Sequence, residues 1–231
     1  MKRWWAGLGL AFACAAHAAP IDDLVIAAEL NDGRGVLSLL LNGVDPNQPD
    51  SRGRKALFVA AKEESLRAIE SLLASPLTQV DEANAQGETP LMIAAIRGSL
   101  PAVQALVKRG AAVNRPGWTP LHYACSGPDN GVAAFLIAQG ADLNARSENG
   151  TTPLMMAARY GNGELVPLLL KAGAEPRAAN EQELTAADFA VRGGRDAMAK
   201  ELRRAMQERQ RQADAARAAA AAPAPTASGA K

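Results

Sequence analysis

Few side chains in this sequence have the type and spacing that catalysis requires. A nucleophile activated by histidine would have to use His122, because it is the only histidine after residue 18. Cys125 follows it by three positions, at a site expected to lie in a packed core rather than in a cleft. The acidic pairs Asp22-Asp23 and Glu63-Glu64 are typical of solvated surface. We therefore expect no catalytic residue and no enzymatic activity.

Patterns for metals and cofactors are also missing. No cluster of histidine and cysteine has the spacing of a zinc site. Gly193-Gly194 is a lone turn signal, and neither a phosphate-binding glycine loop nor a dinucleotide fingerprint occurs. The sequence thus predicts no metal and no cofactor. Function must come from the surface that the folded elements present.

The composition limits what those elements are. The chain has 231 residues, of which 48% are hydrophobic and 4% aromatic, and it carries 25 basic and 24 acidic residues. This excludes disorder throughout, collagen and the charge profile of a nucleic-acid-binding protein. Two cysteines are too few for a small disulfide scaffold. A core of small and branched side chains is typical of stacked short helices.

The first eighteen residues resemble a secretory signal peptide. Lys2 and Arg3 precede an apolar run that ends in Ala16-His17-Ala18, a pattern of basic, apolar and small-residue regions. We expect cleavage there and a periplasmic or secreted location, with lipid anchoring at Cys14 as the alternative. The mature chain would keep Cys125 as its single cysteine, which we expect to be buried and free of disulfides.

The middle of the chain repeats itself. Thr-Pro-Leu occurs at Thr89, Thr119 and Thr152, and a turn glycine follows each motif leucine by 19 residues. These glycines are Gly110, Gly140 and Gly173. Each threonine can cap a helix that proline opens, and each glycine suits a left-handed helix end. A constant internal spacing with variable junctions indicates a repeated helical pair.

These motifs resemble the ankyrin repeat, which has a Thr-Pro-Leu-His-x-Ala signature and a period near 33 residues. The resemblance implies an all-α solenoid of about six stacked helix-turn-helix units with short β-turn fingers, over residues 19–206. The predicted units are an N-terminal cap at 21–47, repeats at 48–84, 85–114, 115–144 and 145–177, and a C-terminal cap at 178–206. Residues 207–231 are expected to form a helical extension and a disordered Ala/Pro-rich tail.

Junction lengths predict further details. Asn47 to Gly53 and Asn144 to Gly150 span six residues, whereas Asn84 to Gly87 and Asn114 to Gly117 span three. We therefore expect the fingers to be shortened at both central junctions. The divergent segment from Ile21 to Glu82 is expected to fray. The tail is basic after Arg195 and could touch RNA or an anionic membrane, although its interspersed acids favour a solvated helix.

The resemblance also implies where partners bind, because ankyrin proteins use the concave face formed by finger tips and first helices. Mapped by motif position, the predicted partner-binding residues of this chain are Arg52, Arg54, Lys62, Glu88, Ile96, Arg97, Trp118, Arg146, Thr151, Arg159 and Tyr160. Trp118 also fits a structural role against a neighbouring finger. His122 occupies the position where family members use the ring to join neighbouring turns.

The predicted function is therefore an exported interaction module, monomeric, that binds another exported protein as scaffold or protective partner. The chain is similar to bacterial periplasmic ankyrin-like proteins, some of which are associated with exported catalases, so the resemblance suggests a catalase or another stress protein as partner. A secreted effector or inhibitor acting on a target outside the producing cell is the alternative. We expect neither nucleic-acid binding nor stable membrane insertion after cleavage.

Overall fold

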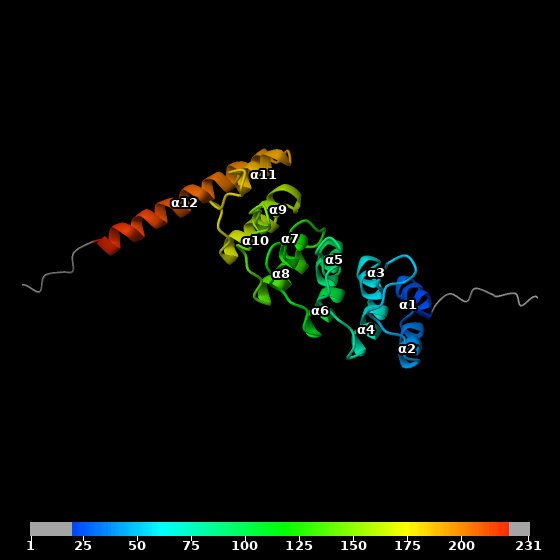
Figure 1. Ribbon diagram of the computed structural model, residues 1–231. Coiled ribbons are helices and arrows are strands. Elements are labelled where there is room, and N and C mark those ends of the chain that lie inside the picture. The colour runs from blue at the N-terminus through cyan, green and yellow to red at the C-terminus, as the bar shows by residue number, and fades with distance from the viewer. Residues whose placement is uncertain (1–19, 222–231) are drawn as a thin grey trace, which may run out of the picture.

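The computed structural model describes residues 20–221, which form twelve helices arranged as successive pairs in a single row (Figure 1). The first helices are α1 (Pro20–Glu29), α3 (Ala56–Lys62), α5 (Pro90–Arg97), α7 (Pro120–Ala124), α9 (Pro153–Tyr160) and α11 (Ala186–Arg192). The second helices are α2 (Gly33–Leu41), α4 (Leu66–Ala74), α6 (Leu100–Lys108), α8 (Asn130–Ala138), α10 (Leu165–Ala172) and α12 (Asp196–Ala221). First helices pack on first helices along the whole row, and second helices pack on one another from α2 to α10. The predicted all-α solenoid is confirmed.

Local sequence explains where the helices begin and end. The Thr89 hydroxyl accepts a hydrogen bond from the Met92 amide at 3.3 Å, and Thr152 accepts one from Met155 at 3.4 Å. Both caps satisfy an amide that the first helical turn leaves unpaired. The second helices α6, α8 and α10 are followed by Gly110, Gly140 and Gly173, whose φ angles are 100°, 82° and 110°. The predicted left-handed glycines are confirmed.

The core is one continuous strip of small and aliphatic side chains. Alanine pairs such as Ala94-Ala95 and Ala157-Ala158 are fully buried between first helices, and they allow close approach. Leu106 and Leu136 fill the space between second helices and are also inaccessible to solvent. Burial of each leucine stabilises the fold by about 2 kcal/mol. Because no pair buries its own apolar face alone, neighbouring pairs stabilise one another.

A ladder of side-chain amides and carboxylates joins consecutive units at the loops. Asn114 Oδ1 accepts from the Asp142 amide at 2.8 Å, and Asn144 does the same for Glu175. Asn47 accepts from Gln79 at 2.9 Å in the same way. At the remaining junction this role belongs to Asp81, which accepts from the Ala112 amide at 2.8 Å.

The ladder corrects one of the two predicted short fingers. Asn84 is not the counterpart of Asn47, because its Oδ1 accepts from Gln86 and Glu88 within its own finger. Asp50 bonds Arg52 and Arg54 in the same manner, so Asn84 and Asp50 occupy the same position in their fingers. The finger that begins after Asp81 therefore has full length. The Asn114 to Gly117 junction is short, as predicted.

Removing one ladder bond should weaken the contact between two units. We expect Asn114→Ala to lower the free energy of unfolding by about 1 kcal/mol, because it removes the hydrogen bonds to the Asp142 amide and the Gly140 carbonyl. The loss is modest because both bonds are exposed to solvent. Chemical denaturation of the wild type and the variant measures the difference. Gln104→Ala, at an exposed helical position outside the ladder, serves as control. Equal loss in both variants would contradict a role for the ladder.

The long α12 closes the row and then continues past it. Met198, Ala199 and Leu202 are buried, whereas most side chains beyond Met206 are exposed. Figure 1 shows the helix projecting from the stack as a separate rod. The predicted signal segment, with Cys14, and the predicted tail from Pro223 lie outside the described residues. Within residues 20–221 no helix is both long and apolar enough to cross a membrane.

Candidate functional site

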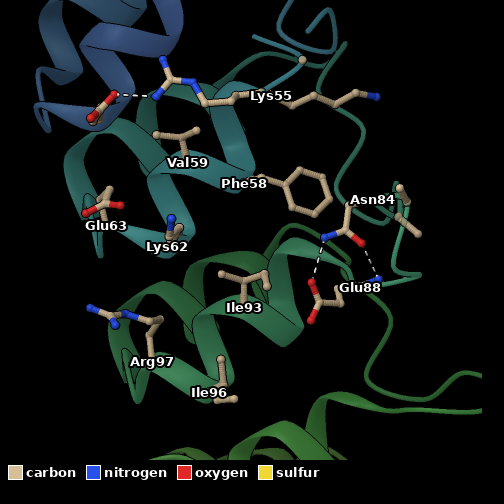
Figure 2. Close-up of a pocket in the computed structure, with 15 residues that line it drawn as sticks. Lys55, Phe58, Val59, Lys62, Glu63, Asn84, Glu88, Ile93, Ile96 and Arg97 are labelled. Atoms are coloured by element: carbon tan, nitrogen blue, oxygen red, sulfur yellow. Dashed lines mark hydrogen bonds and ion pairs between the residues drawn. The ribbon is translucent and has the colours of Figure 1, made fainter. Parts of the chain in front are cut away.

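The exposed sides of the first helices and the fingers form one face, which we call the concave face after the surface predicted from the sequence. Its N-terminal part is a groove of about 780 Å³ between α3 and α5, which we call the charged groove (Figure 2). Phe58, Val59, Ile93 and Ile96 supply its apolar walls. Its charged and polar lining includes Lys62, Glu63, Arg97, Lys55, Asn84 and Glu88. The groove offers apolar contact with charges of both signs around it.

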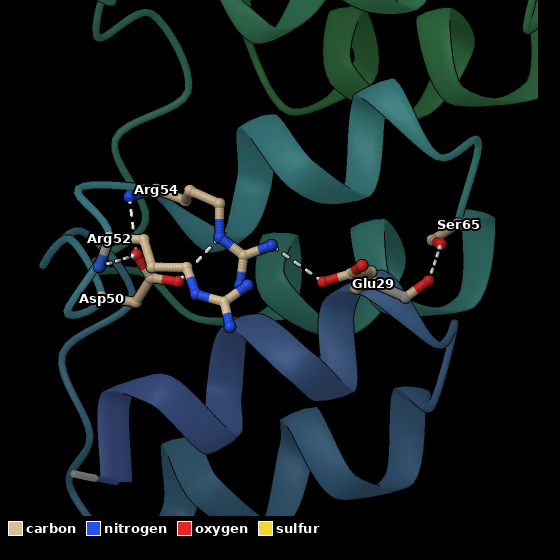
Figure 3. A network of polar contacts seen from close by, with 5 residues as sticks. All are labelled: Glu29, Asp50, Arg52, Arg54 and Ser65. Carbon is tan, nitrogen blue, oxygen red and sulfur yellow. Dashed lines mark hydrogen bonds and ion pairs between the residues drawn. The ribbon is translucent and has the colours of Figure 1, made fainter. Parts of the chain in front are cut away.

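The finger beside this groove is held by an ion-pair network (Figure 3). Asp50 accepts the Arg54 amide at 2.7 Å and its Nε at 2.8 Å, and Arg54 Nη1 donates to Glu29 at 2.9 Å. Burial alone would raise the pKa of Asp50, but the bonds from Arg54 and Arg52 outweigh it and lower that pKa. The bonds to Glu29 and Asp50 raise the pKa of Arg54. The network ties this finger to α1.

A second cavity, which we call the aromatic pocket, lies between α5 and α9. Its volume is about 440 Å³, and its lining residues are Ile96, Trp118, His122, Tyr123, Ser126, Met156 and Tyr160. The rings of Trp118 and Tyr123 meet edge to face, with centroids 6.4 Å apart and planes at 83°. Most of its lining atoms belong to apolar or aromatic side chains, so the pocket favours an apolar guest.

Charged groups surround the aromatic pocket. The Tyr123 hydroxyl donates to Glu88 Oε1 at 3.1 Å. Burial and the nearby Glu88 carboxylate both raise the pKa of Tyr123, to about 12. The phenol therefore stays protonated. Arg159 holds its guanidinium 5.0 Å from the centroid of the Tyr160 ring. Tyr160 is 54% exposed and so presents this pair at the surface.

His122 lies under this pocket and joins two units. Its Nδ1 accepts a hydrogen bond from the Thr119 amide at 3.1 Å, and its Nε2 donates to the Thr151 carbonyl at 2.9 Å. Burial lowers the pKa of His122, so the ring is neutral. Cys125 is buried, and burial raises the pKa of its thiol. The histidine therefore serves as a bridge between repeats, as its motif position predicts.

The structure assigns most of the eleven predicted partner-binding residues to one of the two cavities. Lys62, Glu88, Ile96 and Arg97 line the charged groove together with Arg54, and Ile96 also lines the aromatic pocket. Trp118 and Tyr160 line the aromatic pocket, next to Arg159. Arg52 lies exposed on its finger. The residues of the two cavities form one surface that extends from α3 to α9, because Ile96 lines both, whereas Arg52 lines neither cavity.

Two of the predicted contacts have internal roles. Thr151 is wrong as a partner-binding residue, because it is only 2% exposed and its carbonyl accepts the bond from His122. Arg146 is exposed, but its Nη2 donates to the Ala179 carbonyl at 2.7 Å and links neighbouring fingers. Arg97 pairs with Glu64 at 3.0 Å, a half-exposed ion pair that contributes little stability and leaves the side chain accessible.

The residues of this surface that sequence reasoning missed include Phe58, Tyr123 and Met156. Phe58 lines the charged groove, and Tyr123 and Met156 line the aromatic pocket. Tyr123 and Met156 each stand four positions after the motif threonine, and Ile93 is their counterpart in α5. That position is three residues before the Ile96 position, and residues three apart lie on the same face of a helix. Helical spacing from the predicted contacts would have identified both.

Comparison with known proteins agrees with this geometry. Models of ankyrin repeats match residues 24–116 and 77–147 (described as three copies) and residues 136–190 (many copies). The chain is similar to ankyrin repeat and SAM domain-containing protein 6 of Rattus norvegicus, with 34% identity over 48% of this chain and 13% of that protein. It is similar to the nuclear factor NF-kappa-B p105 subunit of Mus musculus, with 36% identity over 52% of this chain and 13% of that protein.

A shorter relative is protein phosphatase 1 regulatory subunit 27 of Mus musculus, which is 39% identical over 32% of this chain and 50% of its own length. The chain thus spans half or less of these curated relatives. What they share with it is the repeat array.

Proposed function

Because the chain belongs to the ankyrin repeat family, we propose that it is an exported interaction module that binds another exported protein through its concave face. The observation that carries this proposal is the continuity of the charged groove and the aromatic pocket, which share Ile96 as a common wall. Aromatic and arginine side chains, which dominate binding energy at protein interfaces, gather at this surface. The role is that of a scaffold or protective partner.

The export part of the proposal rests on the first eighteen residues, whose pattern is typical of a cleavable secretory signal. Cell fractionation tests it. Retention in the periplasm supports a partner within the same envelope, for which the sequence resemblance suggests a catalase as the first candidate. Release into the medium favours instead an effector or inhibitor with a target outside the cell. A full-length product in the cytoplasm would contradict export.

Binding through the concave face is tested by capture with the tagged full chain from an extract of exported proteins. We expect Lys62→Glu, Arg97→Glu and Tyr160→Ala together to reduce recovery of a partner at least about tenfold, because these exposed side chains span both cavities. Trp118 is left unchanged, since it packs on His122 with centroids 5.2 Å apart and its loss would disturb the fold.

A matched variant controls for altered charge and stability. Lys108→Glu, Lys171→Glu and Leu41→Ala make the same kinds of change on exposed positions of second helices, away from the concave face. This control should capture the partner as the wild type does, and circular dichroism should show unchanged helicity in both triple variants. Equal recovery by the concave-face variant and the wild type would refute the proposed surface.

A further inference from the structure

The aromatic pocket exists because one unit departs from the pattern of its neighbours. Helix α7 has five residues, whereas α5 and α9 have eight. Ser126 and Gly127 stand where α5 carries Ile96-Arg97 and α9 carries Arg159-Tyr160. Helices α5 and α9 therefore each carry two large side chains at positions where the unit of α7 has only a serine and a glycine. The pocket is the space left between α5 and α9. Ile96 of α5 and Tyr160 of α9 line it from the two flanking helices, and Trp118, Tyr123 and Met156 also line it.

The tight packing at Gly127 maintains this gap. A Cβ atom at Gly127 would lie 2.9 Å from the Ala95 carbonyl oxygen and 3.0 Å from that of Ile96. Because both neighbours are backbone atoms, a larger residue would force α5 and α7 apart. Ser126 is not under this constraint, since it is partly exposed and its hydroxyl only donates to the His122 carbonyl one turn earlier. Gly127 therefore fixes the shape of the pocket, whereas Ser126, which also lines it, can be substituted by a larger residue.

Charge differs between the two ends of the pocket. At the finger end, Glu88 bonds Tyr123, and the Glu148 carboxylate lies against Gly117 of the short junction. Arg115 is near, but its Nη1 donates to the Gly87 carbonyl at 2.6 Å. At the other end, Arg159 stacks on Tyr160 and makes no ion pair within residues 20–221, and Arg192 follows at the equivalent position of α11.

We propose that the aromatic pocket is the specificity site for an extended segment of the partner, in which one large apolar side chain is followed by an acidic residue. This inference rests on the proposed function. The apolar side chain enters between Ile96 and Tyr160, and the carboxylate pairs with Arg159. Apolar burial against Trp118, Tyr123 and Met156 supplies affinity. The opposite charges at the two ends of the pocket fix the direction of the segment, because the reversed orientation places the acid against Glu88 and Glu148.

The test uses a displayed library of random 12-residue peptides, selected on the full chain. We expect enriched peptides to carry Leu, Met, Phe or Trp next to Asp or Glu. A synthetic peptide of the enriched sequence should bind Ser126→Phe and Tyr160→Ala at least tenfold more weakly than the wild type. Gln104→Phe, which adds the same side chain to an exposed site on α6, should bind as the wild type does, and circular dichroism should show unchanged helicity in Ser126→Phe.

Charge reversal tests the orientation. The Arg159→Glu variant should bind the acidic peptide at least tenfold more weakly than the wild type does. It should bind the same peptide with lysine in place of the acidic residue more tightly than the wild type does. Fluorescence reports occupancy directly in a chain with Trp4→Phe and Trp5→Phe, because Trp118 is then its single tryptophan. An emission shift on binding supports the site.

Several results would overturn the inference. These are enrichment of peptides without an apolar anchor, no enrichment at all, and binding that ignores Ser126→Phe or Arg159→Glu. If capture of the protein partner nevertheless depends on Lys62, which lines the charged groove alone, the proposed function stands and the aromatic pocket is not the specificity site. If capture depends on no residue of the concave face, both proposals fail.

Discussion

Acidification from about pH 7.5 to about pH 5 is expected to destabilise the protein through His122. The folded chain holds this ring neutral, because burial lowers its pKa below the ordinary value of 6.5, whereas the unfolded chain protonates it normally. Below pH 6.5 the unfolded state therefore binds more protons than the folded state, and stability falls as the pH falls. Above pH 6.5 the contribution of His122 is fully present.

Denaturation of the wild type and His122→Gln across this range measures the effect. The glutamine variant should lose the pH dependence between pH 7.5 and 5. His17→Gln should retain it, which separates the two histidines of the chain. Asp50 and Asp188, whose pKa values lie below the ordinary 3.8, act only in stronger acid. A glutamine variant that is as acid-sensitive as the wild type would assign the effect to other groups.

Removal of the ring should have a larger effect than its titration. We expect His122→Ala to lower the free energy of unfolding by about 3 kcal/mol. The variant leaves a cavity under Trp118 and removes the hydrogen bonds of the ring, so the buried Thr119 amide and Thr151 carbonyl lose a partner. A drop below about 1 kcal/mol would mean that His122 does not join the two units.

Much of this fold could be predicted from sequence because its determinants are local and repeat. Thr-Pro at the start of a first helix and glycine at the end of a second helix act within a few residues, so Thr152 before α9 and Gly173 after α10 could be assigned without knowledge of the neighbours. Stacking follows once each pair has an apolar face that it does not cover alone. Three matching copies then determine the spacing of the rest.

The details of the surface depended on contacts between units, which spacing does not reveal. Asn84 and Asn114 are the same residue type at similar places in the sequence, yet one bonds its own finger and the other bonds the next unit. Thr151 occupies a motif position that is partly exposed in the other units, but it is buried here, and its carbonyl accepts a bond from the His122 ring of the preceding unit. The aromatic pocket required the length of α7, which ends three residues before its neighbours do.

Hydrogen exchange should be far faster in the first unit than in the middle of the array. A terminal unit contacts one neighbour instead of two, and α2 buries only Val36 fully, while Leu37 and Leu41 are 45% and 79% exposed. Helix α8 buries Val132, Ala133 and Leu136 between two neighbours. We expect amides of α2 to exchange on the order of 100-fold faster than those of α8, in line with a lower free energy of local opening.

The extent of this fraying distinguishes the structure from the sequence pattern. The pattern predicts loose packing from Ile21 to Glu82, but α3 and α4 bury nine side chains, and Ile69 and Leu72 are as inaccessible to solvent as Leu106 and Leu136 of the central helices. Fast exchange should therefore end before Ala56. Peptide-resolved mass spectrometry of the full chain locates the boundary. Fast exchange through α4 would mean that its burial does not produce local stability, and slow exchange in α2 would show that the array opens as a single cooperative unit.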